Sequence, residues 1–378
     1  MLSTLGSYFY LNFTVQQVTS YICIPSINFS PLSSPINTKN SIAIIFPISV
    51  ITLLLASLVC PSCRKVPASQ TFQENLSIDT LETKPSSVAL DTASYYKKLI
   101  LLSNGDTTGR WPVKSALPLP GAILPFHRIV AYYGNLYSKQ MGILGEVPPQ
   151  QMLRMLLHEC KKWEKADSLF PVKPALHYIA LTAQTTGSRM SLRMPFHQID
   201  SILALAKRVD ALVFLDLQLG WSNLYDELPR LEKYLSMPQV HLGIDPEFAM
   251  QNGKIPGSQI GNLDASEVNY ASNYLRKLVQ KHQLPPKLLI VHRFTKNMLT
   301  GSHRIKTSPE VQLVIHMDGF GARALKKNTY RSYIYPEPVQ FTGFKIFYKN
   351  DARLDPKGIL NPEDLLDLRP IPSYIQYQ

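Results

Sequence analysis

Two carboxylates stand two positions apart in the segment Val240–Phe248, which reads VHLGIDPEF. Asp245 and Glu247 follow an apolar run that has the composition of a buried β-strand. Side chains alternate along a strand, so residues two apart leave on the same side. If the extended geometry continues through Pro246, both carboxylates point into one space. That space lies at the carboxyl end of the strand, where barrel enzymes of alternating strands and helices keep their chemistry.

Such a pair is suited to acid–base catalysis on a glycosidic bond. Two neighbouring carboxylates do not both ionise easily, so the pKa of one is raised and it becomes a usable acid. Glycoside hydrolysis needs one acid to protonate the leaving oxygen and a second group to stabilise or attack the oxocarbenium-like centre. Other apolar runs also end in acids, and the predicted catalytic carboxylates are Glu247, Asp245, Asp216 and Asp318.

Further polar and aromatic residues follow the ends of the same kind of run. A single strand-end Asp often only caps the next helix, and a lone His is often a hydrogen-bonded core residue, so the prediction depends on the whole set. The residues predicted to bind substrate are Tyr133, Gln184, Gln218, His292, His316, Lys345 and Tyr348.

The positions of these residues depend on a regular alternation of strands and helices. The strand-like runs are Arg128–Tyr133, Ala175–Ala183, Ala211–Leu217, Val240–Asp245, Lys287–His292, Val311–Met317, Phe344–Tyr348 and Tyr374–Tyr377. Most are continuously apolar, as parallel strands covered on both faces are. This rhythm predicts a closed (β/α)8 barrel of the TIM type over residues 123–378. The alternative, a doubly wound open sheet, would need a glycine-rich phosphate turn after the first strand, and Tyr133-Gly134-Asn135 is not one.

Helix signals lie between the strand runs. Asn223 can cap a helix that Pro229 should break, and Asp264 and Glu267 have the spacing of a capping box. The stretch Arg293–Glu310 has weak periodicity and is expected to be largely loop.

The first third of the chain has a different composition. Residues 42–60 form a hydrophobic segment whose 18-residue core, Ile42–Val59, carries no charge and has about the length of a bilayer span. Signal peptide, lipoprotein signal ending at Cys60, and uncleaved anchor all fit it. Residues 1–41 are expected to be a disordered leader, and residues 61–122 a flexible linker with a short helix near 89–102. The predicted location is therefore the cell envelope, membrane-anchored or extracellular.

The charge and the cysteine content of the chain indicate which classes of binding partner to expect. The net charge is +12, and no run of Lys/Arg with interleaved aromatics occurs, so nucleic acid is not expected. Anionic headgroups or wall polymers are natural neighbours of a basic exported protein. Cys60 and Cys63 lack a second pair at zinc spacing, and no His-x-His or HExxH is present, so no metal or other cofactor is predicted. The sequence does not indicate an oligomeric state.

The Asp-x-Glu at the end of the fourth strand resembles the corresponding motif of family 18 glycoside hydrolases and family 25 lysozymes, both exported barrels. In those families the Glu matching Glu247 is the acid, and the Asp matching Asp245 assists an acetamido group or positions the intermediate. The barrel region also resembles uncharacterised bacterial secreted or lipoprotein-type barrels, through Tyr-Tyr-Gly, Met-Gly-x-Leu-Gly-Glu, Gly-Ile-Asp-Pro-Glu, His-x-Asp-Gly-Phe-Gly and Gly-Phe-Lys-x-Phe-Tyr. The likeness at the Asp-x-Glu implies an exported hydrolase of carbohydrate or cell-wall glycan, whereas the broader likeness names no reaction.

Two alternatives remain open at this point. One is a non-catalytic envelope lipoprotein that binds a glycan in the barrel mouth. The other is a metal-dependent hydrolase with ligands from separate strands, namely His292, His316, Asp318 and Asp216.

Overall fold

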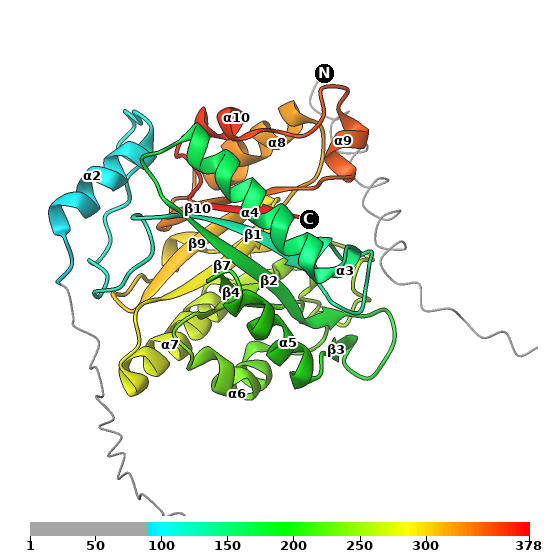
Figure 1. Cartoon of the computed structure of the whole chain (residues 1–378). Helices are drawn as coiled ribbons and strands as arrows, with labels where there is room; N and C mark the ends of the chain where they lie inside the picture. Colours follow the sequence, from blue (N-terminus) through cyan, green and yellow to red (C-terminus); the bar gives the residue numbers. More distant parts are fainter. Residues whose placement is uncertain (1–88) are drawn as a thin grey trace, which may run out of the picture. The chain divides into compact units, whose positions relative to one another are not determined.

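The computed structural model describes residues 89–378 of the chain. Within them, eight parallel strands close into a barrel (Figure 1), because each strand pairs with the next and the last pairs with the first. The strands are β1 (Arg128–Gly134), β2 (Val172–Ala183), β4 (Leu212–Leu217), β5 (Val240–Ile244), β7 (Lys287–Arg293), β9 (Val311–Met317), β10 (Phe341–Ile346) and β11 (Tyr374–Tyr377). The predicted TIM-type barrel is confirmed, and the open sheet is wrong because β11 pairs with β1.

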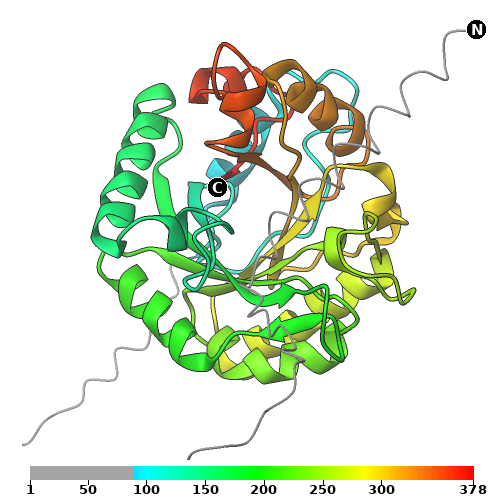
Figure 2. The same ribbon diagram turned by 90° about the vertical axis from the view of Figure 1, so that its right-hand side faces the viewer.

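Helices surround the barrel, and Figure 2 shows the ring they make. They are α3 (Ile143–Glu146), α4 (Pro149–Ala166), α5 (Phe196–Lys207), α6 (Leu224–Leu235), α7 (Ala265–His282), α8 (Arg323–Thr329), α9 (Asn350–Leu354) and α10 (Pro362–Leu366). Short segments decorate the loops: β3 (Ser191–Arg193), β6 (Leu263–Asp264), β8 (Leu299–Thr300), the 3₁₀ helices η2 (Pro246–Phe248), η3 (Lys296–Met298) and η4 (Ser302–Arg304), and the π-helical turn η5 (Tyr330–Ile334).

The predicted amino-terminal caps of α6 and α7 are confirmed, whereas the predicted break inside α6 is wrong. Asp264 and Glu267 form the predicted capping box of α7, and Asn223 caps α6 by accepting from the Asp226 backbone N–H at 3.0 Å. Pro229 does not break α6, which is continuous through it. A proline removes one helical hydrogen bond, and the buried side chains of Leu228 and Leu231 hold the helix against the barrel on both sides of it.

Strand alternation divides the apolar residues into two layers. On β7, Leu288 and Ile290 point into the barrel, whereas Leu289 and Val291 point outward to the helices. The inward residues at the amino-terminal end of the barrel are apolar, and they pack with Phe214 and Val314 into an inner core. This core forms a solid floor beneath the opposite, carboxyl-terminal end of the strands, which we call the mouth.

The predicted linker boundary is wrong for residues 89–122. The helix α2 (Thr92–Ser103) covers the amino-terminal end of the barrel and buries Tyr95, Leu99 and Leu102 in the inner core. Downstream of α2, the buried Trp111 indole N–H donates to the Tyr335 carbonyl at 3.1 Å. These residues stay packed because their apolar side chains close an end of the barrel that would otherwise face water.

The remaining predictions for the amino-terminal part, namely the leader 1–41, the segment 42–60 and the linker up to residue 88, lie outside the described residues. Among residues 89–378, no helix has both the length and the apolar character needed to span a bilayer.

Candidate active site

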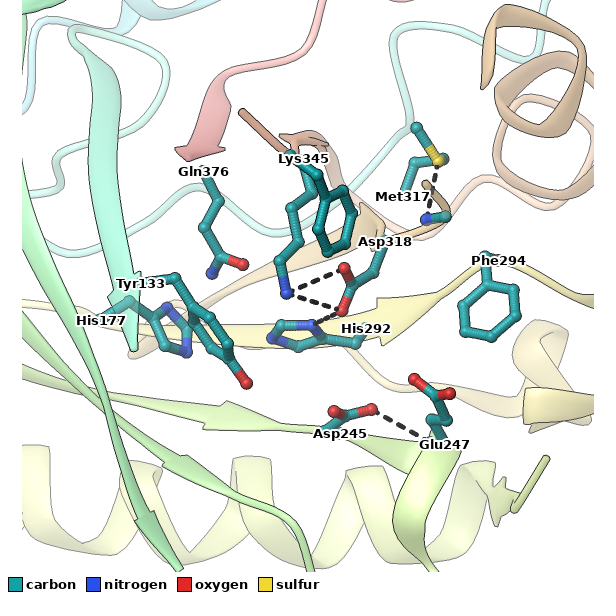
Figure 3. A network of polar contacts seen from close by, with 12 residues as sticks. Tyr133, His177, Asp245, Glu247, His292, Phe294, Met317, Asp318, Lys345 and Gln376 are labelled. Carbon is teal, nitrogen blue, oxygen red and sulfur yellow. Dashed lines mark hydrogen bonds and ion pairs between the residues drawn. The ribbon is translucent and has the colours of Figure 1, made fainter. Parts of the chain in front are cut away.

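Every strand of the barrel contributes an inward-facing polar residue at the mouth, either within the strand or directly after it. Inward positions on β7 run Leu288, Ile290, His292, so the lining changes from apolar to charged towards the mouth. The residues that the strands and their ends bring together there are Tyr133, His177, Asp216, Asp245, His292, Asp318, Lys345 and Gln376, most of which are seen in Figure 3. All are at most 7% exposed, so their charges must be balanced within the protein.

His292 lies at the centre of an ion network. Its Nδ1 is 2.5 Å from Asp318 Oδ2, and its Nε2 is 3.5 Å from Asp216 Oδ1. Lys345 Nζ lies 2.9 Å from Asp318 Oδ1 on the other side (Figure 3). Burial alone would lower the pKa of His292, but the two carboxylates outweigh it and raise that pKa to about 10. His292 is therefore an imidazolium at neutral pH.

The two carboxylates of this network stay ionised. Burial opposes ionisation of Asp216 and Asp318, yet the pKa of each lies well below its usual range. His292 is the main cause for Asp216, and Lys345 followed by His292 for Asp318. Two negative charges thus face two positive ones.

Asp216 has two further partners. Tyr133 donates its hydroxyl to Asp216 Oδ2 at 3.0 Å, and His177 Nε2 lies 3.1 Å from Oδ1. Burial lowers the pKa of His177 to about 4, so this imidazole is neutral. Its Nε2–H then faces Asp216, and its Nδ1 accepts from the Tyr374 hydroxyl at 2.6 Å.

Asp245 and Glu247 differ from these two carboxylates because, among residues 89–378, no cationic side chain forms an ion pair with either of them. Burial raises the pKa of Asp245 to about 7, and the nearby Asp318 and Asp216 add to the rise. Burial, followed by repulsion from Asp245 and Asp318, raises the pKa of Glu247 well above its usual range. Figure 3 shows the Glu247 carboxyl group above Asp245 and facing Phe294. Glu247 is partly exposed, whereas Asp245 is buried.

The two carboxylates converge, although not for the predicted reason. The strand ends at Ile244 and the chain turns into η2, so the extended geometry does not continue through Pro246. Asp245 instead caps this turn, its Oδ1 accepting from the Glu247 backbone N–H at 3.1 Å. The Gly261 backbone N–H donates to the Glu247 carbonyl at 2.7 Å and fixes the turn from outside.

Two glycines make room for the network. A Cβ on Gly243 would lie 2.4 Å from Asp216 Oδ1 and 2.5 Å from His177 Nε2. A Cβ on Gly343 would lie 2.5 Å from Nδ1 of His316. Both glycines occupy inward positions of their strands, so the space that their missing side chains leave is filled by the polar residues of neighbouring strands.

A second buried ion pair holds the loops that carry the network. Lys326 Nζ donates to Asp351 Oδ2 at 2.7 Å and to the Lys345 carbonyl at 2.8 Å. Asp351 also accepts from the Gly321 and Phe347 backbone N–H groups, both at 2.9 Å. The segment after Asp318 and the end of β10 are thereby joined.

The predicted substrate-binding residues fall into three groups. Tyr133, His292 and Lys345 belong to the network, and Gln218 joins it through its Nε2, 3.4 Å from the Tyr133 hydroxyl. His316 lies inside the barrel, its ring centroid 5.0 Å from that of His292, and neither of its nitrogens has a hydrogen-bond partner among the described residues.

Among the described residues, neither Gln184 nor Tyr348 forms a hydrogen bond with a side chain of the network. Gln184 donates to Thr182 Oγ1 at 2.9 Å in the turn between β2 and β3. Tyr348 was predicted to line the mouth, and this is wrong. The Tyr348 ring packs on the outside of the barrel, stacked on the Tyr377 ring. Its hydroxyl oxygen lies 3.1 Å from the hydroxyl oxygen of Tyr132. Side chains on β10 alternate, so Lys345 points into the barrel and Ile346 points outward. Tyr348, two residues after Ile346, points outward as well.

Three network residues were missing from the sequence prediction. His177, Tyr374 and Gln376 lie within strands, whereas the prediction considered residues at strand ends. A polar residue at an inward position of an otherwise apolar strand was the available signal. The alternation of β2, with Leu176 and Tyr178 facing outward, assigns His177 to the interior.

The donor atoms also have the composition of a metal site. One ligand atom from each of Asp245, His292 and Asp318 lies within 4.8 Å of the others, and the same holds for His177, Asp216 and His292. The Lys345 ammonium and the His292 imidazolium already balance these carboxylates, however. A cation at either set would replace the contacts of His292 with Asp216 and Asp318 and compete with Lys345 for Asp318.

Comparison with protein-family models gives no match for this chain, and comparison with curated proteins gives none either. The barrel is compatible with an enzyme, but a fold alone does not choose a reaction. The chemistry must be argued from the side chains at the mouth.

Proposed function

We propose that the chain is a glycoside-hydrolase-like enzyme that uses Glu247 as its general acid. The observation that carries this proposal is the contrast among four buried or partly buried carboxyl groups. Asp216 and Asp318 are held ionised by His292 and Lys345, whereas Asp245 and Glu247 have raised pKa values. Environments that push the pKa values of neighbouring acids apart assign acid and base roles.

Glu247 is the better placed of the two protonated groups. It is partly exposed at the mouth, so its proton can reach the oxygen of a bound substrate. Asp245, with a pKa near 7, ionises close to neutrality and stabilises or positions a cationic centre beside it. Tyr133 and His177 hold Asp216, and His292 separates the two permanent anions.

The charge balance favours an uncharged substrate. In the active form Glu247 is protonated and Asp245 is ionised, so three anions face two cations, and the remaining negative charge disfavours an anionic substrate. A neutral sugar ring needs no counter-ion, and its hydroxyl groups suit a lining of carboxylates, imidazoles and an amide. The upstream segment Ile42–Val59 supports export, so carbohydrate or cell-wall glycan is the proposed substrate class, as the resemblance implies.

The substitution Glu247→Gln tests the proposal. It removes a proton donor and keeps the shape, so hydrolysis of glycan substrates should fall about 10²–10⁴-fold, the usual contribution of a general acid, with unchanged unfolding free energy. The matched control is Glu363→Gln, an exposed residue in the first turn of α10, which should leave activity unchanged. Wild-type protein that binds glycan without cleaving it would favour the non-catalytic alternative. Equal activity of both variants would remove Glu247 from the mechanism.

A metal-dependent hydrolase is the second candidate function, because carboxylate and imidazole atoms at the mouth lie within 4.8 Å of one another. Metal analysis of the purified protein and assay after chelation distinguish it. Stoichiometric metal, with activity lost on chelation and restored by a divalent cation, would replace acid catalysis by Glu247 with metal-assisted hydrolysis.

A further inference from the structure

The helix α2 is apolar on two faces. Tyr95, Leu99 and Leu102 pack under the barrel, and the opposite side exposes Tyr96 (53%), Ile100 (64%) and Leu101 (37%). A helix on the surface of a soluble domain normally turns charged and polar residues outward. We call Tyr96, Ile100 and Leu101 the outer face of α2. Each of these three side chains is more than one third exposed.

The charges within α2 are both positive. Lys97 is exposed between Ile100 and Leu101 on the helix surface, Lys98 follows it, and the nearest acid is Asp91, which caps the amino terminus of the helix. Lys98 donates to the Leu169 carbonyl at 2.6 Å, which brings the exposed Leu169 side chain (57%) beside the helix. Apolar side chains with flanking lysines are the composition of helices that lie in the interface of an anionic membrane.

The order of elements along the chain points to the same partner. α2 is the first helix of the described residues, and the uncharged segment Ile42–Val59 precedes it. The 32 residues from 60 to 91 have a covalent reach of at most about 110 Å. A membrane that holds Ile42–Val59 is therefore within reach of α2.

We propose that the outer face of α2 rests on the surface of an anionic lipid bilayer. Because α2 covers the end of the barrel opposite to the mouth, this contact turns the mouth away from the lipid (Figure 1). Glu247 and its neighbours then face the aqueous side. This proposal does not depend on the proposed reaction, so the two are tested independently.

The test uses the full chain reconstituted into vesicles of phosphatidylcholine and phosphatidylglycerol. A nitroxide is attached at Ile100→Cys after Cys23, Cys60 and Cys63 are replaced by Ser, and the buried Cys160 is kept. The control label is at Tyr225→Cys, exposed in the first turn of α6 at the mouth end. Collision with oxygen, which concentrates in lipid, is compared with collision with a water-soluble nickel chelate.

The expected result is that the Ile100 label gains oxygen collisions and loses chelate collisions on reconstitution, while the Tyr225 label stays aqueous. An Ile100 label as accessible to the chelate as the Tyr225 label would overturn the proposal. Spin–spin broadening between Ile100 labels would also overturn it, since a second copy would then cover the face. The same outcome in pure phosphatidylcholine would overturn the requirement for anionic lipid.

A second variant separates α2 from the upstream segment, which can bind lipid by itself. With the label moved to Leu101→Cys, the substitutions Tyr96→Gln and Ile100→Gln should return the label to water. The matched pair Tyr137→Gln and Leu192→Gln, on similarly exposed residues near the mouth, should not. All four are surface positions, so thermal unfolding should be unchanged. A Leu101 label that stays in lipid in the α2 variant would contradict the proposal.

Discussion

Asp216 and Asp245 are both buried carboxylates on inward positions, and their surroundings give them opposite behaviour. Asp216 receives the Tyr133 hydroxyl and lies beside the His177 and His292 rings. Asp245 accepts the Glu247 backbone N–H and has a His292 nitrogen within 4.8 Å, but burial together with the two other carboxylates outweighs this cation and raises its pKa. Opposite charge within about 4–6 Å favours an ionised acid, whereas burial near like charge favours a protonated one. The residue type alone therefore does not assign the role.

This contrast predicts the pH dependence of hydrolysis. The value of kcat/KM should rise as pH passes through about 7, because Asp245 ionises there, and fall at higher pH when Glu247 loses its proton. Steady-state kinetics across this range would show two limbs. Asp245→Asn should abolish the rising limb and keep the falling one. A wild-type profile that is flat through neutrality would contradict the assignment.

The network also predicts how stability depends on pH. The pKa of His292 is about 10 in the folded protein, against 6.5 in a model peptide. Below 6.5 the imidazole is charged in both states and its stabilisation is complete. As pH rises from 6.5 to 10 the unfolded state loses the proton first, so this stabilisation declines and is gone above 10. The raised pKa of Asp245 also makes the free energy of unfolding fall as pH rises, here between about 4 and 7, because the unfolded state loses this proton first.

Substituting His292 tests this contribution. His292→Gln leaves Asp216 and Asp318 without their shared cation, so the free energy of unfolding should fall by about 3–5 kcal/mol near neutral pH. Chemical denaturation of both proteins from pH 6.5 to 10 is the measurement. The wild type should lose more stability than the variant across this window. Parallel curves would mean that His292 is not a charged link in the network.

At the scale of single elements, strand alternation accounts for most of the site that could be predicted. Parity along a strand assigns each residue to the inside or the outside, and it places Asp216, His292 and Lys345 correctly. Parity also places Tyr348 outside, on the same side as Ile346, so the prediction that put both Lys345 and Tyr348 at the mouth did not follow the alternation. Contacts between strands, such as that of His177 with Asp216, depend on register, which one sequence does not reveal.

Glycines on inward strand positions offer a test at this scale. Gly243→Ala forces a Cβ against Asp216 and His177, so overpacking should cost about 1–3 kcal/mol of unfolding free energy and lower activity. Gly253→Ala is the control, because its Cβ would meet no atom within 4 Å. Its positive φ makes about 1 kcal/mol of destabilisation expected, with activity unchanged. Full activity in Gly243→Ala would show that the network tolerates displacement.

For the whole molecule, the sequence was sufficient to predict the barrel and insufficient to predict where it begins. Eight apolar runs separated by helices leave few alternatives once no phosphate turn follows the first. Closure itself, with β11 beside β1, follows from packing of the whole chain. The helix α2 has apolar residues on both faces, so its hydrophobic pattern does not show which side is buried. The buried side of α2 is the one that packs against the amino-terminal end of the barrel.

Docking of α2 under the barrel predicts different effects for two adjacent leucines. Leu102 is buried against the inner core, and Leu101 is on the outer face. Without lipid, Leu102→Ala should lower the free energy of unfolding of the full chain by about 2–5 kcal/mol, because it leaves a cavity at the floor of the barrel. Leu101→Ala, which removes the same atoms from an exposed site, should stay within about 0.5 kcal/mol of wild type. Chemical denaturation followed by far-UV circular dichroism measures both. Equal, small effects would mean that residues 89–122 behave as the flexible linker that their composition predicts, and that the barrel floor is stable without α2.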